Sequence, residues 1–132
     1  MYKSVIFDLD GTILNTLDDL ADSVNYALGS FGYPLRSIDE VREFVGNGIK
    51  KLIERAVPKG TDDETTDKVL SAFKQHYGEN SDVKTKPYDG ILSMLQGLKN
   101  AGIKTASLPL NCFKLSSILS TFSYKELSSL DI

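Results

Sequence analysis

The sequence predicts an α/β protein in which an incomplete, doubly wound parallel core carries an inserted all-helical unit. Three observations lead to this fold class. A continuous apolar run ends in two closely spaced acids, the next part of the chain shows helical periodicity with no strand, and a further helix and a second apolar run follow. This order of strand, helical insertion, helix and strand is typical of the beginning of a layered α/β domain.

The first strand is predicted over residues 4–9, where the apolar residues do not alternate with polar ones. A run without alternation is typical of a strand that is buried on both faces. Asp8 and Asp10 are spaced i, i+2, so their side chains point to the same side of a strand. Burying two carboxylates together is unfavourable unless a cation or a reaction needs them. We therefore interpret this pair as a candidate reaction centre rather than as a turn cap.

Four helices are predicted between residue 15 and about residue 80. Thr16 is the expected cap of the first helix, and Ser37 to Glu40 form a capping box for a short second one. Asn47-Gly48 opens the third helix, and a further capping box at Thr61 to Glu64 opens the fourth. Apolar residues at helical spacing are expected to face inward, and they include Leu17, Leu20, Ala21, Val24, Ala27, Leu28, Phe31, Ile49, Leu52, Ile53, Ala56, Val69, Leu70, Phe73 and Tyr77.

After this insertion the chain is predicted to return to the core. Residues 81–87 are polar and are expected to form a connector. A helix is predicted over Tyr88 to Asn100, and the apolar run at residues 103–108 predicts a second strand. The inward residues expected on the helix are Ile91, Met94, Leu95 and Leu98.

The composition limits the class of protein. The chain has 132 residues, of which 41% are hydrophobic and 25% charged, with a net charge of −3, which is ordinary for one soluble domain or a small domain plus a fragment. The mild acidity argues against a nucleic-acid binder, and no apolar run reaches the ~18 residues of a membrane span. The single cysteine, Cys112, excludes an intramolecular disulfide. Because the N-terminus also shows no signal peptide, a cytoplasmic location is expected.

The D-x-D-G-T run from Asp8 to Thr12 resembles the signature of the haloacid dehalogenase superfamily. Over residues 1 to about 106, the chain resembles the phosphoglycolate phosphatase-like group of that superfamily. The other segments that carry the resemblance are Leu14-Asn15-Thr16, Val45-Gly46-Asn47-Gly48 with Lys50, Lys51 and Leu52, Lys86-Pro87-Tyr88-Asp89-Gly90, and residues 98–106. The resemblance implies a Rossmann-like core, made of residues 1–14 and 84–132, that carries a helical cap at residues 15–83.

The resemblance also implies a phosphatase that acts on a small phosphorylated metabolite with Mg²⁺ as its cofactor. Asp8 would attack phosphorus to form an aspartyl-phosphate, and Asp10 would protonate the leaving oxygen and then activate water. The Asp8 carboxylate and the Asp10 backbone carbonyl would bind Mg²⁺, which prefers oxygen ligands. The implied phosphate- and substrate-binding residues are Gly11, Thr12, Asn47, Gly48, Lys51 and Ser107.

For several of these residues, a purely structural role stays open as an alternative. Lys51 and Arg55 fit a solvated helix face as well as they fit attraction of a phosphate. Gly46 and Gly48 fit a helix end and a turn as well as a substrate loop. His76 has no partner at metal-ligand spacing, so we expect it to be a surface histidine.

After residue 106 the sequence no longer matches the motifs of the family. The family's second motif, a strand that ends in Ser or Thr, has no match at its expected position near Pro109, and Ser107 is the nearest substitute. The family's later lysine and acidic metal-binding cluster also lack a match, because the only acids that follow are Glu126 and Asp131. We favour a frameshift or truncation as the explanation. The alternative is a natural short form whose tail makes the next helix.

Three functions therefore stay open. The chain is a phosphatase that truncation impairs, an inactive fragment that at most binds phosphate or Mg²⁺ or serves as an interaction module, or a sugar phosphomutase of the same superfamily. Two parallel strands leave unpaired edges. We therefore expect marginal stability, or self-association through the unpaired edge of the core.

Overall fold

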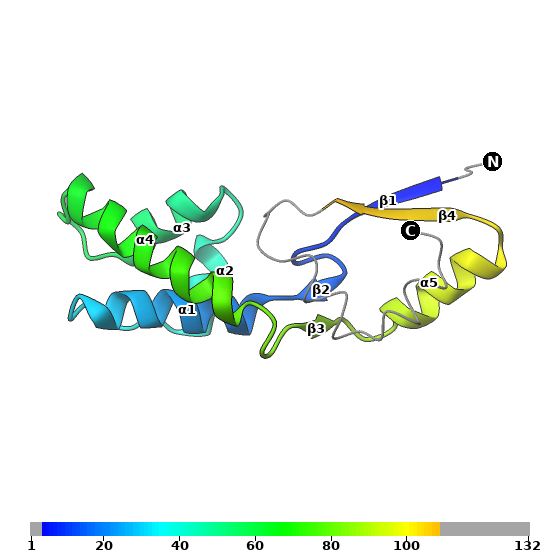
Figure 1. Ribbon diagram of the computed structural model, residues 1–132, viewed down its shortest axis with the longest axis horizontal. Helices are drawn as coiled ribbons and strands as arrows, with labels where there is room; N and C mark the ends of the chain where they lie inside the picture. The colour runs from blue at the N-terminus through cyan, green and yellow to red at the C-terminus, as the bar shows by residue number, and fades with distance from the viewer. Residues whose placement is uncertain (1–3, 109–132) are drawn as a thin grey trace. The chain divides into compact units, whose positions relative to one another are not determined.

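In the computed structural model of the chain, the structure describes residues 4–108 (Figure 1). These residues form helices and strands in mixed order, so the predicted α/β class is confirmed. The elements are β1 (Ser4–Asp8), β2 (Leu14–Asn15), α1 (Leu17–Ser30), α2 (Ile38–Phe44), α3 (Ile49–Ala56), α4 (Asp63–Asn80), β3 (Lys86–Pro87), α5 (Ile91–Asn100) and β4 (Lys104–Leu108).

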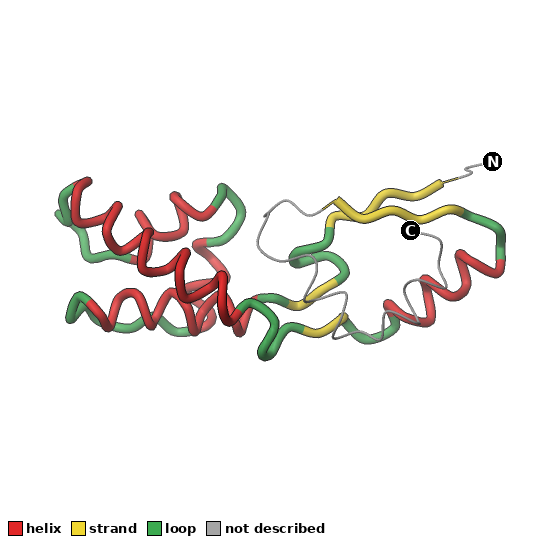
Figure 2. The backbone as a smooth tube through the Cα atoms, in the orientation of Figure 1, coloured by secondary structure: helices red, strands yellow, loops and turns green. Residues whose placement is uncertain are grey.

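The chain divides into two compact units. Leu17–Lys84 make one of them, here called the helical unit, and Met1–Thr16 with Thr85–Ile132 make the other, here called the α/β unit. Helices α1 to α4 belong to the helical unit, where the tube of Figure 2 shows only helix and loop. All described strands and helix α5 belong to the α/β unit.

A parallel pair of strands organises the α/β unit. Strands β1 and β4 run side by side in Figure 1, with Ser4 level with Lys104 and Asp8 level with Leu108. Strands β2 and β3 form a short antiparallel pair, and α5 packs against β4. The buried centre is the pair Ile13 and Leu14, against which Phe7, Leu9 and Ile91 pack.

The expectation that the first strand is buried on both faces was wrong. Ile6 in β1 is 65% exposed. Within residues 4–108, β1 forms a sheet with β4 alone, and burial of a strand requires neighbours on its faces. The inward face of α5 is also less buried than predicted, since Leu95 is buried but Met94 is exposed.

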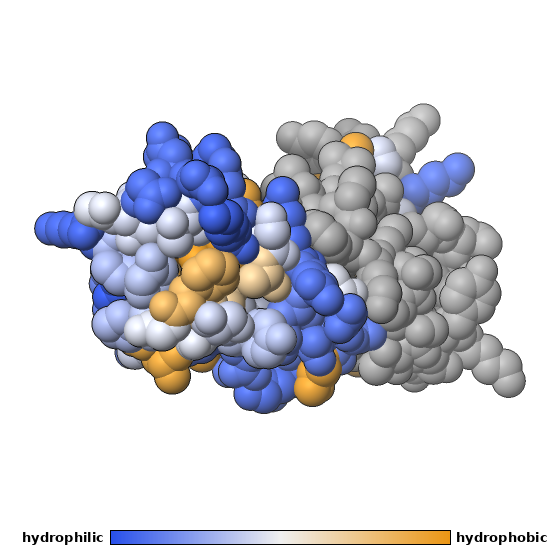
Figure 3. Space-filling view, turned by 60° about the vertical axis from the view of Figure 1, so that its left-hand side comes forward, coloured by the Kyte–Doolittle hydropathy of each residue, from blue (hydrophilic) through white to orange (hydrophobic). Residues whose placement is uncertain are grey.

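The helical unit has a well-buried apolar core. Phe73, Leu28 and Ile53 are fully buried, and the predicted inward residues of α3 and α4 beyond Ile49 all lie in this core. Helix α1 packs along α4, while α2 contacts α1 and α3. Apolar residues are also found on the unit's surface, where Figure 3 shows them in small areas between hydrophilic residues; Tyr26, Leu35 and Val45 are among those exposed.

Local side-chain hydrogen bonds fix where the helices begin. The predicted capping box of α2 is confirmed, because the Ser37 hydroxyl accepts from the Glu40 N–H and the Glu40 carboxylate accepts from the Ser37 N–H. The cap of α4 is Asp62 and not Thr61, whose hydroxyl donates to the Pro58 carbonyl instead. Helix α5 begins at Ile91 rather than Tyr88 because Gly90, with φ at 85°, is left-handed.

Several expectations fall outside the described residues. The helix expected in the tail, Cys112 and the acids Glu126 and Asp131 all lie beyond residue 108. None of the helices within residues 4–108 combines the length and the apolar character that a membrane crossing needs.

Candidate active site

The turn after β1 positions the two acids that the sequence singles out. The N–H groups of Ile13 and Leu14 both donate to the Leu9 carbonyl, at 3.1 and 3.0 Å, and the Gly11 N–H donates to the Leu14 carbonyl at 2.9 Å. Gly11 has φ at 74°, and nothing lies within 4 Å of the place where a Cβ would be. Glycine is therefore required there by the backbone conformation and not by crowding. The result is a tight turn that begins where β1 ends.

Asp8, the last residue of β1, has an unsatisfied carboxylate. Its Oδ1 is buried and has no hydrogen-bond partner among the residues that the structure describes. A buried carboxylate oxygen without a partner is costly, and such groups need an explanation such as catalysis or an ion. Asp8 therefore carries the feature expected of a reaction centre.

The environment of Asp10 favours its protonated form. Burial raises the pKa of the Asp10 carboxyl, and the negative charge of Asp8 raises that pKa further. The Asp8 carboxylate is therefore close enough to influence the ionisation of Asp10. A carboxyl whose pKa is raised by burial and by a neighbouring charge is typical of an acid that gives up a proton in catalysis.

The residues at this turn fit a magnesium ion in part. The available donors are oxygens, namely the Asp8 carboxylate with its partnerless Oδ1 and the Asp10 backbone carbonyl. Mg²⁺ is commonly held by one or two carboxylates, with waters and substrate phosphate completing its shell. Within residues 4–108 no group of three or more His, Cys, Asp or Glu side chains forms a metal cage. The donor set suits an open site of this kind.

The other residues implied for phosphate binding in the α/β unit lie at different places. Gly11 and Thr12 are exposed in the turn itself. The Gly11 N–H is already bonded to Leu14. Ser107 lies in β4 level with Phe7, so Leu108, which has no hydroxyl, is the position level with Asp8. The register thus brings Ser107 near the end of β1 but one step before the acids.

The candidate residues of the helical unit lie at the junction of α2 and α3. Asn47 is exposed in the connecting loop, and Gly48 is the N-cap of α3 with no side-chain cap. Lys51 forms an ion pair with Glu54 and is 57% exposed. That pair fits the solvated helix face considered for this lysine. Lys50 forms a similar exposed pair with Asp67.

Arg55 has a structural role that its sequence position does not indicate. Its Nη1 donates to the Phe44 carbonyl and its Nη2 donates to Asn47 Oδ1, both at 2.8 Å. The partners lie 11 and 8 residues earlier in the chain, which matches neither of the side-chain spacings that meet on one helix. No pattern in the sequence could have identified this contact.

Comparison with known proteins assigns the family. The family model described as haloacid dehalogenase-like hydrolase matches residues 5–107. The chain belongs to this family. The match includes the Asp8 and Asp10 turn, both strands of the parallel pair and the whole helical unit.

Relatives within the haloacid dehalogenase-like family carry a consistent name. A phosphoglycolate phosphatase from Thiobacillus denitrificans is 32% identical over 110 residues, which are 80% of this chain and 48% of the relative. One from Psychrobacter arcticus is 38% identical over 109 residues, which are 77% of this chain and 47% of the relative. The chain thus spans about half the length of the curated relatives it matches.

Solved structures agree with this assignment. The crystal structure of a predicted phosphoglycolate phosphatase from Haemophilus somnus has a TM-score of 0.82 and 31% identity, covering 96% of this chain and 60% of its own. A predicted phosphatase from Clostridium acetobutylicum has a TM-score of 0.76 and 25% identity, covering 95% of this chain and 57% of its own. The fold is therefore that of the haloacid dehalogenase-like family.

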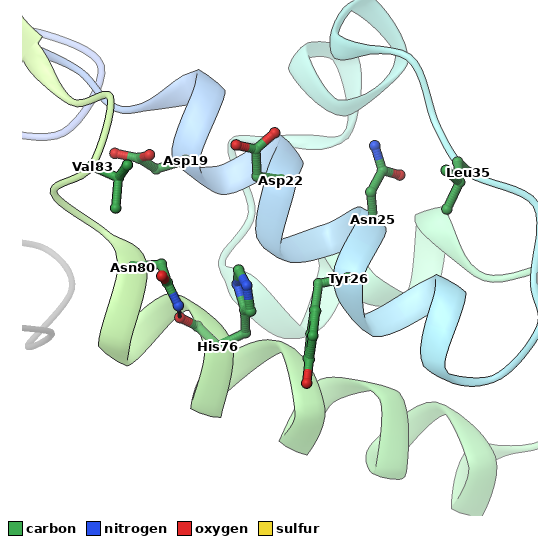
Figure 4. Close-up of a pocket in the computed structure, with 8 residues that line it drawn as sticks. All are labelled: Asp19, Asp22, Asn25, Tyr26, Leu35, His76, Asn80 and Val83. Carbon is green, nitrogen blue, oxygen red and sulfur yellow. Dashed lines mark hydrogen bonds between the residues drawn. The ribbon is translucent and has the colours of Figure 1, made fainter.

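A pocket of about 480 Å³ lies on the helical unit (Figure 4). The side chain of His76 stacks on Tyr26 with ring centroids 4.1 Å apart, and its Nδ1 is 2.9 Å from the buried Ser23 hydroxyl. The expectation of a surface histidine was therefore wrong, since His76 is half-buried and packs α4 on α1. The residues that line the pocket are Asp19, Asp22, Asn25, Tyr26, Leu35, His76, Asn80 and Val83.

The Asp19 carboxylate links α1 to the last residue of the helical unit, Lys84. Asp19 is only 2% exposed, and both of its oxygens accept from the Lys84 N–H at 2.9 Å. The Lys84 ammonium in turn pairs with Asp22 at 2.6 Å, which raises the pKa of Lys84. These bonds join the first turns of α1 to Lys84, the last residue of the unit.

Proposed function

We propose that the chain is a Mg²⁺-dependent phosphatase of the phosphoglycolate phosphatase-like kind, which hydrolyses a small phosphate monoester. The observation that carries the proposal is the buried, partnerless Oδ1 of Asp8 beside a second carboxyl whose pKa is raised. Membership of the haloacid dehalogenase-like hydrolase family and the name of the relatives support the same reaction class. The Oδ1 of Asp8 is suited to act as a nucleophile because no described hydrogen bond holds its lone pairs.

In the first proposed step, an oxygen of the Asp8 carboxylate forms a bond to phosphorus. The bond between phosphorus and the ester oxygen breaks, so the phosphoryl group is transferred to Asp8 as an aspartyl-phosphate. The leaving alkoxide takes the proton of the Asp10 carboxyl. The raised pKa of Asp10 supports this role because a carboxyl must be protonated to act as the acid.

In the second proposed step, Asp10 acts as the base. The carboxylate left by the first step takes a proton from water, and the water oxygen attacks the phosphorus of the aspartyl-phosphate. The bond between phosphorus and Asp8 breaks, which releases inorganic phosphate and restores the Asp8 carboxylate. Asp10 is then protonated again, so both acids return to their starting forms.

The Asp8 carboxylate and the Asp10 backbone carbonyl would hold Mg²⁺ at this turn. The ion would supply positive charge to offset the negative charge of the phosphoryl oxygens. Thr12, exposed in the turn, and Ser107, at the neighbouring strand, are proposed to donate hydroxyl hydrogen bonds to the phosphate. In the helical unit, Asn47, Gly48 and Lys51 are proposed to contribute to substrate selection.

An inactive phosphate- or Mg²⁺-binding fragment is the second candidate. One observation favours it. The position level with Asp8 in β4 is Leu108, a residue type whose side chain has no hydrogen-bond donor. Losing a donor that stabilises transition-state charge typically costs about 10²–10³ in rate.

We also propose how the chain associates, where it is located and which partners it binds. Self-association through the edge of the β1–β4 sheet is supported by the 65% exposure of Ile6. A cytoplasmic location is supported by the single cysteine, as expected in a reducing compartment. Small phosphorylated metabolites, and no nucleic acid or membrane, are the proposed partners.

Phosphate release from p-nitrophenyl phosphate and from phosphoglycolate, with Mg²⁺ or with EDTA, tests the proposal. We expect Mg²⁺-dependent release by the parent chain and a loss of at least about a hundredfold in Asp8→Asn. Asp89→Asn, which removes an exposed carboxylate of the same unit, is the matched control and should retain the parent rate. Equal rates in Asp8→Asn and the parent would exclude catalysis at this turn. No release from folded parent chain would favour the inactive fragment.

A further inference from the structure

The pocket on the helical unit is formed mainly by neighbouring side chains of α1 and α4. Asp22 and Tyr26 are four residues apart on α1. His76 and Asn80 have the same spacing on α4, so each pair lies on one face of its helix. In Figure 4, His76 rises from α4 toward α1, and Tyr26 reaches from α1 toward α4. All the lining residues belong to Leu17–Lys84, so the pocket is complete within the helical unit.

Each of the two helices contributes one oxygen acceptor to this pocket. The Asn80 Nδ2 group donates to the His76 carbonyl at 2.9 Å. Because a carbonyl can only accept, the oxygen of the Asn80 amide is the end left open, and it has no hydrogen-bond partner within residues 4–108. On α1, Oδ2 of Asp22 pairs with the Lys84 ammonium at 2.6 Å, while Oδ1 makes no hydrogen bond in the same part of the chain.

The charged groups at the pocket favour a cation. Asp19 and Asp22 both line it, and the Lys84 ammonium offsets only one of these two negative charges. The hydrogen bond and charge of Asp22, followed by the charges of Asp18 and Asp19, raise the pKa of Lys84. Three carboxylates therefore act on a single ammonium group, which leaves the surroundings of the pocket negative.

The apolar part of the pocket favours an organic cation over a metal ion. Leu35 and Val83 line the pocket and are 63% and 68% exposed. Tyr26 is also exposed, although its ring stacks on His76. Among residues 4–108, no group of three or more His, Cys, Asp or Glu side chains could hold a metal. Apolar side chains and an open aromatic ring beside two acceptors suit a cation that carries an apolar body.

We propose that this pocket binds a small alkylammonium compound, which is a protonated primary amine on a short apolar chain. The ammonium head donates to Oδ1 of Asp22 and to Oδ1 of Asn80. The chain lies against the side chains of Tyr26, Leu35 and Val83. The pocket volume of about 480 Å³ lies within the range of about 300–1,000 Å³ that is typical of small-molecule sites. This binding does not depend on the proposed phosphatase function.

Titration of the full chain with n-butylammonium chloride at constant ionic strength, followed by NMR, tests the proposal. We expect the Asn80 side-chain amide and the Tyr26 ring signals to shift and saturate together. n-Butanol has the same chain without the charge and should bind at least about fivefold more weakly. The bare ammonium ion lacks the chain and should bind at least about threefold more weakly. Butyrate, whose charge is opposite, should give no saturable shift.

Two substitutions in one ion pair should change the n-butylammonium affinity in opposite directions. Asp22→Asn keeps the shape of the side chain but removes its charge, so it should weaken the affinity about three- to fivefold. Lys84→Met removes the ammonium that competes for Asp22 but keeps the backbone N–H that bonds Asp19, so it should strengthen the affinity about two- to threefold. Asp39→Asn, the matched control, removes an exposed carboxylate paired with Arg42 and should change the affinity less than about twofold. A gain in affinity cannot come from a loss of folding, so Lys84→Met decides the question if Asp22→Asn does not fold.

Three outcomes would overturn the alkylammonium site. The first is equal binding of n-butanol and n-butylammonium, because the pocket would then respond to the chain and not to the charge. The second is an unchanged affinity in Asp22→Asn, and the third is an affinity of Lys84→Met no higher than that of the parent. Asp8→Asn should lose turnover while its n-butylammonium titration stays the same as that of the parent, so a failure of the proposed phosphatase function is seen separately.

Discussion

The two units of this chain differ in the burial of their apolar residues and in the environment of a buried carboxylate. In the helical unit, Phe73 is fully buried and the buried Asp19 carboxylate accepts hydrogen bonds with both oxygens. In the α/β unit, Ile6 is 65% exposed in its strand and Asp8 Oδ1 is buried without a described partner. The helical unit is organised for packing, whereas the α/β unit holds groups whose local arrangement is unfavourable.

The proposed chemistry lies in the unit that holds the buried carboxylate oxygen without a described partner. An unpartnered carboxylate and a carboxyl with a raised pKa both destabilise the folded state, and such groups are typical of active sites. This chain thus combines a well-packed helical unit with a turn that holds a buried carboxylate oxygen without a described partner. Six substitutions, in three pairs, test this description.

The largest effect is expected from a core substitution in the helical unit. Phe73→Ala removes a fully buried ring and should lower the free energy of unfolding by about 3–5 kcal/mol, since it loses both hydrophobic transfer energy and packing. Ile6→Thr, in exposed β1, keeps a β-branched residue and should change it by less than about 0.5 kcal/mol. Urea unfolding followed by NMR signals of each unit measures both. Similar losses in the two variants would contradict the contrast in packing.

A smaller effect is expected at the end of the helical unit. Asp19→Ala removes a buried charged acceptor for the Lys84 N–H and should cost about 1.5–3 kcal/mol. Asp22→Ala, in the same helix, removes only an ion pair whose side chains are 52% and 53% exposed, so it should cost less than about 1 kcal/mol. The same urea experiment compares them. A cost for Asp22→Ala as large as that for Asp19→Ala would show that the ion pair, and not the buried bond, holds this end.

The helical unit was predictable from the sequence because its signals are local. The Ser37 capping box and the spacing of Val69, Phe73 and Tyr77 depend on neighbours within a few residues, and the structure confirms them. The error at the start of α4 is also local, since Thr61 and Asp62 are adjacent candidates for one cap. Only the structure shows that the Thr61 hydroxyl is committed to the Pro58 carbonyl.

The α/β unit and the loop between α2 and α3 were less predictable because their properties depend on distant residues. The exposure of Ile6 is set by what covers the faces of the sheet, and no pattern within β1 contains that information. The pairing of Arg55 with Asn47 depends on how α3 folds back on the loop. By contrast, Asp8 and Asp10 could be singled out because an apolar run that ends in two closely spaced acids is unusual in itself. Their assigned roles in catalysis and metal binding stay predictions.

The two units should also respond to pH with opposite signs, and Asp10 gives the larger response. Its pKa in the folded state is raised by burial and by Asp8, so the unfolded chain releases this proton at lower pH. Stability from the protonated form is therefore present below about pH 3.9, the unfolded pKa, and is lost as the pH rises through the folded pKa. Asp10→Asn, measured in EDTA by thermal unfolding, should be more stable than the parent at pH 7 and equal to it at pH 3. Lower stability of the variant at pH 7 would contradict this account.

Asp62 at the start of α4 gives the smallest effect, with the opposite sign. Hydrogen bonds from the Thr65 N–H and hydroxyl lower the pKa of the Asp62 carboxyl. Its contribution to stability is therefore present above the unfolded value of about 3.9 and is lost as the pH falls through the lowered folded pKa. Asp62→Asn keeps a good cap residue but loses the charge, so it should be slightly less stable than the parent at pH 7. That deficit should disappear once the pH falls below the lowered folded pKa, because the parent carboxyl is then protonated too. Thermal unfolding of the two variants across the same pH series compares an acid that caps a helix with one proposed to act in catalysis. Deviations of the same sign would contradict the opposite pKa shifts of the two acids.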